Sequence, residues 1–108
     1  MTVHSTTLVS TDNAGRYLQQ LCKHWSHSFT VEFTADEGTV IFPPDARGAN
    51  WPGHATLKMR AATGNLDCRL SASAWEQLQE LKSAVARHLD RFAFREGPLR
   101  FDWRDNEE

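Results

Sequence analysis

The sequence predicts a single α+β domain in which two helices pack on one face of an antiparallel sheet. The chain has 108 residues, the size of one domain with its own hydrophobic core. Two stretches repeat apolar residues every three or four positions, as amphipathic helices do. Shorter stretches alternate apolar and polar residues, as half-buried strands do. The expected order is β-α-β-β-β-β-α-β, with residues 1–104 forming the domain.

The first two elements are a strand and a helix. Residues 3–10 are rich in β-branched residues and predict the strand. Asp12 follows and can cap a helix with its side-chain oxygen. The helix is expected to run to about residue 25, because one apolar stripe continues that far: Tyr17, Leu18, Leu21, Cys22 and Trp25.

Four strands are expected next, as two hairpins. Residues 29–34 alternate, a turn follows at 36–38, and residues 39–42 return as the second arm. Pro43 and Pro44 stop that arm. Residues 55–61 and 66–70 alternate on either side of a turn at 63–65 and predict the second hairpin.

A long helix and a closing strand complete the domain. Ser73 with Glu76 three residues later is the pattern of a capping box, and Gly97-Pro98 ends the segment. We expect the apolar stripe of the helix to pack on the strand that carries Phe29, Val31 and Phe33. That stripe contains Trp75, Leu78, Leu81, Val85, Leu89 and Phe92. Residues 99–103 alternate and predict the closing strand, and residues 105–108 are expected to be an acidic frayed tail.

Composition and charge narrow the function classes. The chain has 12 Lys and Arg against 14 Asp and Glu, and this balance, without any nucleic-acid motif, excludes a duplex-binding protein. No run of apolar residues is long enough to cross a membrane, and the N-terminus lacks the pattern of a secretory signal, so we expect a cytoplasmic protein. Two cysteines are too few for a disulfide scaffold.

Three stretches together resemble a known family. They are RYLQQLCKHWSH at 16–27, HLDRFAFRE at 88–96 and LRFDW at 99–103. The chain is similar in their order and spacing to the bacterial domain-of-unknown-function family 2218, and only the loop at 43–53 departs from it. The resemblance implies a small domain that stands alone or is attached to, or encoded near, siderophore-interacting flavin reductases. It implies a link to iron handling, and no residue roles, because the family has no agreed site.

Histidines offer one candidate site. His24 and His27 lie three apart at the end of the first helix, close enough to share a metal ion. His88 or Cys22 could supply a third ligand. Alternatively, the two imidazoles lie there because a helix C-terminus favours their positive form. No enzyme motif is present, and we expect no cofactor.

Arginines offer a second candidate site. Arg87, Arg91 and Arg95 recur every four residues on the long helix, and His88 shares that flank. Guanidinium groups hold anions with paired hydrogen bonds, and Trp51 in the loop could cover such a ligand. The alternatives are that the arginines are a solvated face paired with Asp90 and Glu96, and that Trp51 closes one end of the sheet.

These observations favour a non-enzymatic binding or accessory domain that takes a small anionic ligand or a reductase partner. Two other functions stay open at this stage. One is a self-associating module that forms a homodimer through its sheet face or the Trp51 loop. The other is a metal-dependent enzyme that uses His24, His27 and His88.

Overall fold

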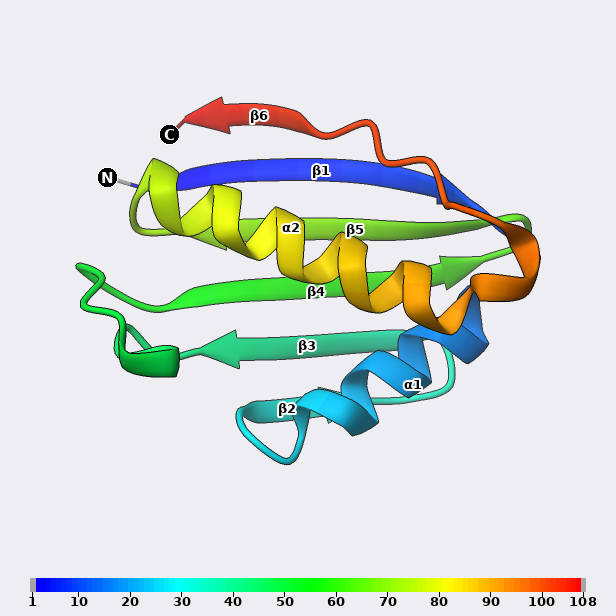
Figure 1. Cartoon of the computed structure of the whole chain (residues 1–108), viewed down its shortest axis with the longest axis horizontal. Coiled ribbons are helices and arrows are strands. Elements are labelled where there is room, and N and C mark those ends of the chain that lie inside the picture. Colours follow the sequence, from blue (N-terminus) through cyan, green and yellow to red (C-terminus); the bar gives the residue numbers. More distant parts are fainter. Residues whose placement is uncertain (1, 108) are drawn as a thin grey trace.

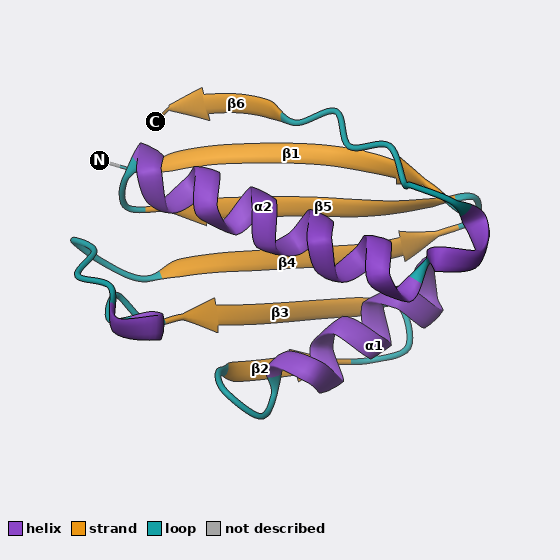
Figure 2. Cartoon of the chain, viewed as in Figure 1, coloured by secondary structure: helices purple, strands orange, loops and turns teal. Residues whose placement is uncertain are grey.

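Six strands form one antiparallel sheet, and two helices lie across one of its faces (Figures 1 and 2). The computed structural model describes residues 2–107. In chain order the elements are β1 (Val3–Ser10), α1 (Ala14–Trp25), β2 (Thr30–Phe33), β3 (Glu37–Phe42), β4 (Ala55–Ala62), β5 (Asn65–Ala72), α2 (Trp75–Phe92) and β6 (Arg104–Glu107). The predicted order of strands and helices is confirmed. Within residues 2–107, neither helix is long and apolar enough to span a membrane.

The strand order in the sheet, β2-β3-β4-β5-β1-β6, decides which helix covers which strands. Helix α1 lies over β2, β3 and β4, and α2 lies over β5 and β1 (Figure 1). The predicted stripe of α2 is buried at Leu78, Val85 and Leu89. The other three residues of the stripe are only half-buried: Trp75, Leu81 and Phe92. The expected packing of that stripe on Phe29, Val31 and Phe33 is wrong, because β2 lies under α1 at the far edge, where Phe33 stays 38% exposed.

Both helices begin two residues later than their predicted caps. The expected cap by Asp12 is wrong, because Asn13 is the residue before α1 and no side chain among the described residues caps the helix. The backbone N–H of Asn13 donates to Thr11 Oγ1 at 3.1 Å, a bond that lies before the first turn. At α2 the side chain of Gln77 reaches back, and its Oε1 accepts from the backbone N–H of Ser73 at 2.8 Å. The predicted capping box of Ser73 and Glu76 does not form, because the helix starts at Trp75 and the residue at its N-cap is Ala74, which has no side-chain cap bond.

The closing strand lies further along the chain than predicted. Residues 99–103 form no strand, and β6 pairs with β1 in the register Val3↔Glu107 and Thr6↔Arg104. Asp105 holds β6 in place, because its Oδ1 accepts from Ser5 Oγ at 2.6 Å and lies 2.5 Å from Lys82 Nζ on α2. Residues 105–107 are thus part of the sheet and not a frayed tail. Glu108, the end of the predicted tail, and Met1, the start of the predicted domain, lie outside the described residues.

A carboxylate joins the end of α2 to the start of α1. Glu96 accepts hydrogen bonds from Thr11 Oγ1 and Asn13 Nδ2, both at 3.0 Å, and from the hydroxyl of Tyr17. The bond from Tyr17 lowers the pKa of Glu96 below its usual value near 4.5. Glu96 therefore pairs with the hydroxyl of Tyr17 on α1 and with the side chains of Thr11 and Asn13 just before that helix, and not with the arginines that precede it.

Glu96→Gln is expected to lower the free energy of unfolding at pH 7 by about 1 kcal/mol, since charge-assisted bonds are lost at an exposed site. Because the folded pKa of Glu96 is lowered, its contribution is present above about pH 4.5 and disappears as the pH falls through the lowered pKa. Urea unfolding at pH 7 and pH 3 tests this. Glu32→Gln, on an exposed strand position, is the control. An equal loss for Glu96→Gln at both pH values would contradict the assignment.

Candidate functional site

A cleft of about 230 Å³ opens between α2 and the loop that follows β3. The loop and the N-terminal half of α2 lie at the same end of the sheet (Figure 1). Aromatic rings form much of the wall: Trp25, Phe29, Phe42 and Trp51. Helix α2 contributes Gln77, Glu80, Leu81, Ser83, Ala84 and Arg87, and the loop adds Pro43, Ala46 and Arg47. The wall thus combines apolar rings with a few polar groups, the usual make-up of a small-molecule site.

Hydrogen bonds close the loop on itself and fasten its Gly53 end beside α2. The backbone N–H of Trp51 donates to Pro44 O at 2.9 Å, which closes the loop on itself. At the far end, Gln77 Nε2 donates to Gly53 O at 3.1 Å, and the backbone N–H of Gly53 donates to Ser73 Oγ at 3.0 Å. Gln77 therefore joins the segment before α2 to the loop that carries Trp51.

Arg47 has an unusual backbone conformation at the edge of the cleft. Its φ of 55° and ψ of 34° lie in the left-handed region, which favours glycine. For an arginine this conformation costs about 1 to 2 kcal/mol. Strain of this kind is concentrated at ligand-binding and catalytic sites. Its presence makes Arg47 a candidate ligand-binding residue.

The charges of the cleft are not neutralised internally. Arg47 and Arg87 line the cleft together with one carboxylate, that of Glu80, and within residues 2–107 neither guanidinium forms an ion pair. Arg87 Nε donates only to Ser83 O, at 3.3 Å along its own helix. The cleft is therefore a site of net positive charge with free hydrogen-bond donors.

Trp25 lies at the bottom of the cleft with its indole almost completely buried. Its ring packs edge-to-face on Phe42, with centroids 5.1 Å apart, and lies 5.0 Å from the ring of His88. The indole Nε1–H has no acceptor among the described residues. Buried donors are almost always paired in native proteins, so this indole N–H is an exception among the described residues.

Only some of the residues predicted to bind an anion lie in the cleft. Arg87 and Trp51 both line the cleft. His88 packs against Trp25, and its Nδ1–H donates to Ala84 O at 2.6 Å. Burial lowers the pKa of His88 below its usual value. Arg91 and Arg95 lie outside the cleft lining, and Arg95 lies over the exposed ring of Phe94, with its guanidinium carbon 5.4 Å from the ring centroid.

The predicted metal ligands come together only in part. The rings of His24 and His88 lie with centroids 5.0 Å apart, so α1 and α2 do bring two of the three histidines together. His27 is exposed beyond the end of α1. Across residues 2–107, no three His, Cys, Asp or Glu side chains form a group that could hold a metal ion.

Both cysteines are free and buried. Burial raises the pKa of Cys22 to about 11 and that of Cys68 to about 12. A thiol with such a pKa is almost fully protonated at neutral pH and is a poor nucleophile. Cys22 and Cys68 therefore act as small apolar core residues.

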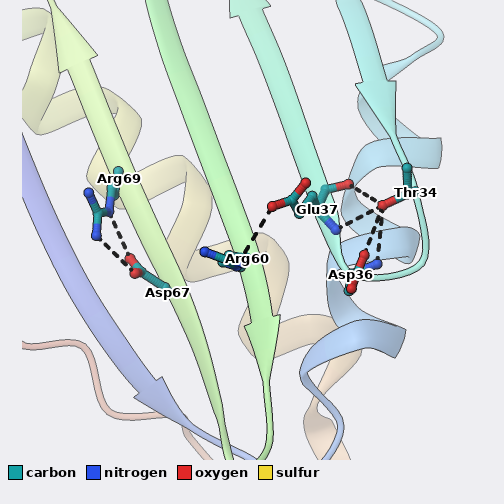
Figure 3. Close-up of polar contacts among 6 residues, drawn as sticks. All are labelled: Thr34, Asp36, Glu37, Arg60, Asp67 and Arg69. Carbon is teal, nitrogen blue, oxygen red and sulfur yellow. Dashed lines mark hydrogen bonds and ion pairs between the residues drawn. The ribbon is translucent and has the colours of Figure 1, made fainter.

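The face of the sheet opposite the helices is polar and carries its own ion pairs (Figure 3). Arg60 Nε lies 3.6 Å from Glu37 Oε1, and Arg69 pairs with Asp67 at 3.3 Å. The exposed apolar residues on this face, Leu8 and Ile41, are separated by β4 and β5 and form no continuous patch. A homodimer through this face stays a prediction.

Several residues of the cleft were not identified from the sequence. Arg47 was missed because its role depends on a left-handed backbone that no local pattern reveals, although the neighbouring Gly48 signals a turn. Trp25 was predicted as core, which it is, but its unpaired N–H is visible only in the packed structure. Gln77 lies beside the predicted stripe, and its bonds to Ser73 and Gly53 depend on the folded path of the loop.

The family model described as "Uncharacterized protein conserved in bacteria (DUF2218)" matches residues 6–104, nearly the whole domain. The chain belongs to this family. The resemblance carried by the RYLQQLCKHWSH, HLDRFAFRE and LRFDW stretches is thus confirmed. The DUF2218 model includes the loop from Pro43 to Gly53 and both walls of the cleft.

A solved structure also resembles this DUF2218 domain. It is the NMR structure of PA4090 from Pseudomonas aeruginosa, with 30% sequence identity, a TM-score of 0.71 and 94% of each chain covered. A single α+β domain with two helices on an antiparallel sheet is therefore shown for this chain. A search of the curated proteins found no match.

Proposed function

We propose that this DUF2218 domain is a non-enzymatic binding domain, and that the cleft between α2 and the Trp51 loop binds a small anionic ligand with an apolar body. The observation that carries the proposal is the combination, in one cleft, of aromatic walls with two guanidiniums that have no carboxylate partner. Aromatic walls favour an apolar ligand body. Guanidiniums bind carboxylates and phosphates with paired hydrogen bonds.

The size of the cleft limits the ligand. Sites for drug-sized ligands measure roughly 300 to 1,000 Å³, and this cleft measures about 230 Å³. The ligand, or the part of it that enters, is therefore small. Within the described lining no hydrogen-bonded pair of nucleophile and base occurs, which supports recognition rather than catalysis.

A more specific version of this proposal is that the domain serves iron or siderophore metabolism. It rests on the resemblance of the chain to the DUF2218 family, which implies proximity to siderophore-interacting reductases. At about 230 Å³ the cleft is smaller than the usual site for a drug-sized ligand, which favours a small anion as its occupant. We therefore propose an accessory role, in which the domain binds a small anion or serves a reductase partner.

Titration of ¹⁵N-labelled protein with sodium benzoate and sodium hexanoate tests the binding site. We expect amide shifts around residues 46–51 and 77–87, and an affinity that falls with added salt. Arg87→Ala should weaken binding about 10-fold, the lower end for charge-assisted bonds, since both guanidiniums are exposed. Arg60→Ala, on the opposite face of the sheet (Figure 3), is the matched control.

Arg47→Gly separates a loss of binding from a loss of folding. Glycine adopts the left-handed backbone of residue 47 without strain, so this variant should be at least as stable as the parent protein. It should still weaken benzoate binding about 10-fold, because the guanidinium is gone. The proposal is wrong if neither arginine substitution changes the affinity, or if the shifts map to β4 and β5 residues of the opposite face.

A further inference from the structure

We infer that the ligand of the cleft is a single-ring aromatic carboxylate, an inference that rests on the proposed function and names its substrate class. Three features of the cleft carry it. They are an aromatic wall with one unpartnered ring, a buried indole donor without an acceptor, and two guanidiniums at the rim.

The aromatic wall has space for one more ring. Phe42 packs edge-to-face on Phe29, with centroids 4.9 Å apart, and on Trp25 at 5.1 Å. Trp51 comes from the loop side of the same cleft and has no aromatic ring contact among the described residues. A planar ring between Trp51 and this cluster would complete the aromatic packing. Aromatic pairs prefer such offset or edge-to-face contacts.

The polar groups indicate where the oxygens of the ligand lie. Trp25 is 2% exposed, and its Nε1–H can only donate, so it requires an acceptor. Arg47 and Arg87 are also pure donors. A site with these three donor groups, one indole and two guanidiniums, and one carboxylate, that of Glu80, selects a ligand that carries acceptor oxygens and negative charge. A carboxylate on a ring fulfils both requirements.

The volume of the cleft agrees with a ligand that has one aromatic ring. A cavity of about 150 Å³ holds benzene, and the cleft measures about 230 Å³. The additional space accommodates a carboxylate and small ring substituents.

Four probes of graded chemistry test the inference: benzoate, cyclohexanecarboxylate, hexanoate and benzyl alcohol. Benzoate should bind about 3- to 10-fold more tightly than cyclohexanecarboxylate, which has the charge without the aromatic ring. Benzyl alcohol, with the ring and no charge, should bind at least 10-fold more weakly than benzoate. Equal affinity for benzoate and cyclohexanecarboxylate would overturn the aromatic class and leave the proposed anion site standing. Failure of all four probes to bind would overturn both.

The indole N–H resonances give an independent readout. The chain has four tryptophans, and Trp→Phe variants assign their indole signals. Benzoate should shift the Trp25 signal downfield and perturb that of Trp51, and should leave that of Trp103, which stacks on Phe101, unchanged. Benzoate binding without a change at Trp25 would overturn the inference.

Trp51→Leu removes one ring from the loop without altering the core. This variant should bind benzoate and cyclohexanecarboxylate within about 2-fold of each other, because the added aromatic contact is lost. A preference for benzoate as large as that of the parent protein would contradict the placement of the ring beside Trp51.

Discussion

Leu78→Ala is expected to lower the free energy of unfolding by about 2 to 5 kcal/mol, the cost of a cavity in a packed core. Leu78 has 0% of its side chain exposed and lies in the stripe of α2 that packs toward β5 and β1. Because about 5 to 15 kcal/mol is typical of the stability of a whole domain, this single change removes a large share of it. Urea unfolding followed by circular dichroism measures the loss.

Leu81→Ala is the matched control, since the same sequence pattern places both leucines in one stripe. Leu81 is only half-buried and lines the cleft. Its truncation should therefore cost less than half of the Leu78→Ala loss, because part of the side chain already contacts solvent, and it should weaken benzoate binding. Equal losses of stability for the two variants would show that the rotation of α2 is wrong.

Gly38→Ala is expected to cost about 1 to 3 kcal/mol, the usual range for overpacking a core. A Cβ atom at this position would lie 2.7 Å from Cys22 Sγ and 3.3 Å from Leu18 Cδ2. Helix α1 therefore approaches β3 closely only because residue 38 has no side chain. Thermal or urea unfolding of the variant measures the effect.

Cys22→Ala tests whether the Cys22 sulfur is the cause of that cost. The double variant Gly38→Ala with Cys22→Ala should be more stable than the sum of the two single losses predicts, by about 1 kcal/mol, because the two side chains share one space. Additive losses would contradict the predicted contact. Gly64→Ala is not a useful control, since its φ of 81° is itself strained for alanine.

The fold could be predicted from the sequence because side-chain periodicity is set by which residues face the core. The stripe from Leu78 to Leu89 and the alternation in β4 and β5 follow directly from this requirement. The segment at 99–103 shows where periodicity stops being informative. Leu99, Phe101 and Trp103 do alternate and pack on the core, yet the backbone forms no ladder there, and pairing with β1 begins only at Arg104. Alternation reports the direction of side chains and does not report backbone hydrogen bonds.

The candidate site could be predicted only in outline. The spacing of Arg87, Arg91 and Arg95 predicts a basic flank of one helix, but α2 ends at Phe92, so Arg95 lies beyond it in a short 3-10 helix. A row of residues four apart also turns slowly around the helix axis, and the loop meets α2 at a single level. Only Arg87 lies at that level. The partner guanidinium, Arg47, comes from a loop whose path depends on contacts with Ser73 and Gln77 that are distant in sequence.

The central claim is that the cleft between α2 and the Trp51 loop is the ligand site, and intermolecular nuclear Overhauser effects in the benzoate complex test it most directly. We predict effects from the ring protons of benzoate to the side chains of Trp51, Leu81 and Ala84, which line the cleft. Effects to Leu8, Lys58 or Arg69, on the opposite face of the sheet, would contradict it.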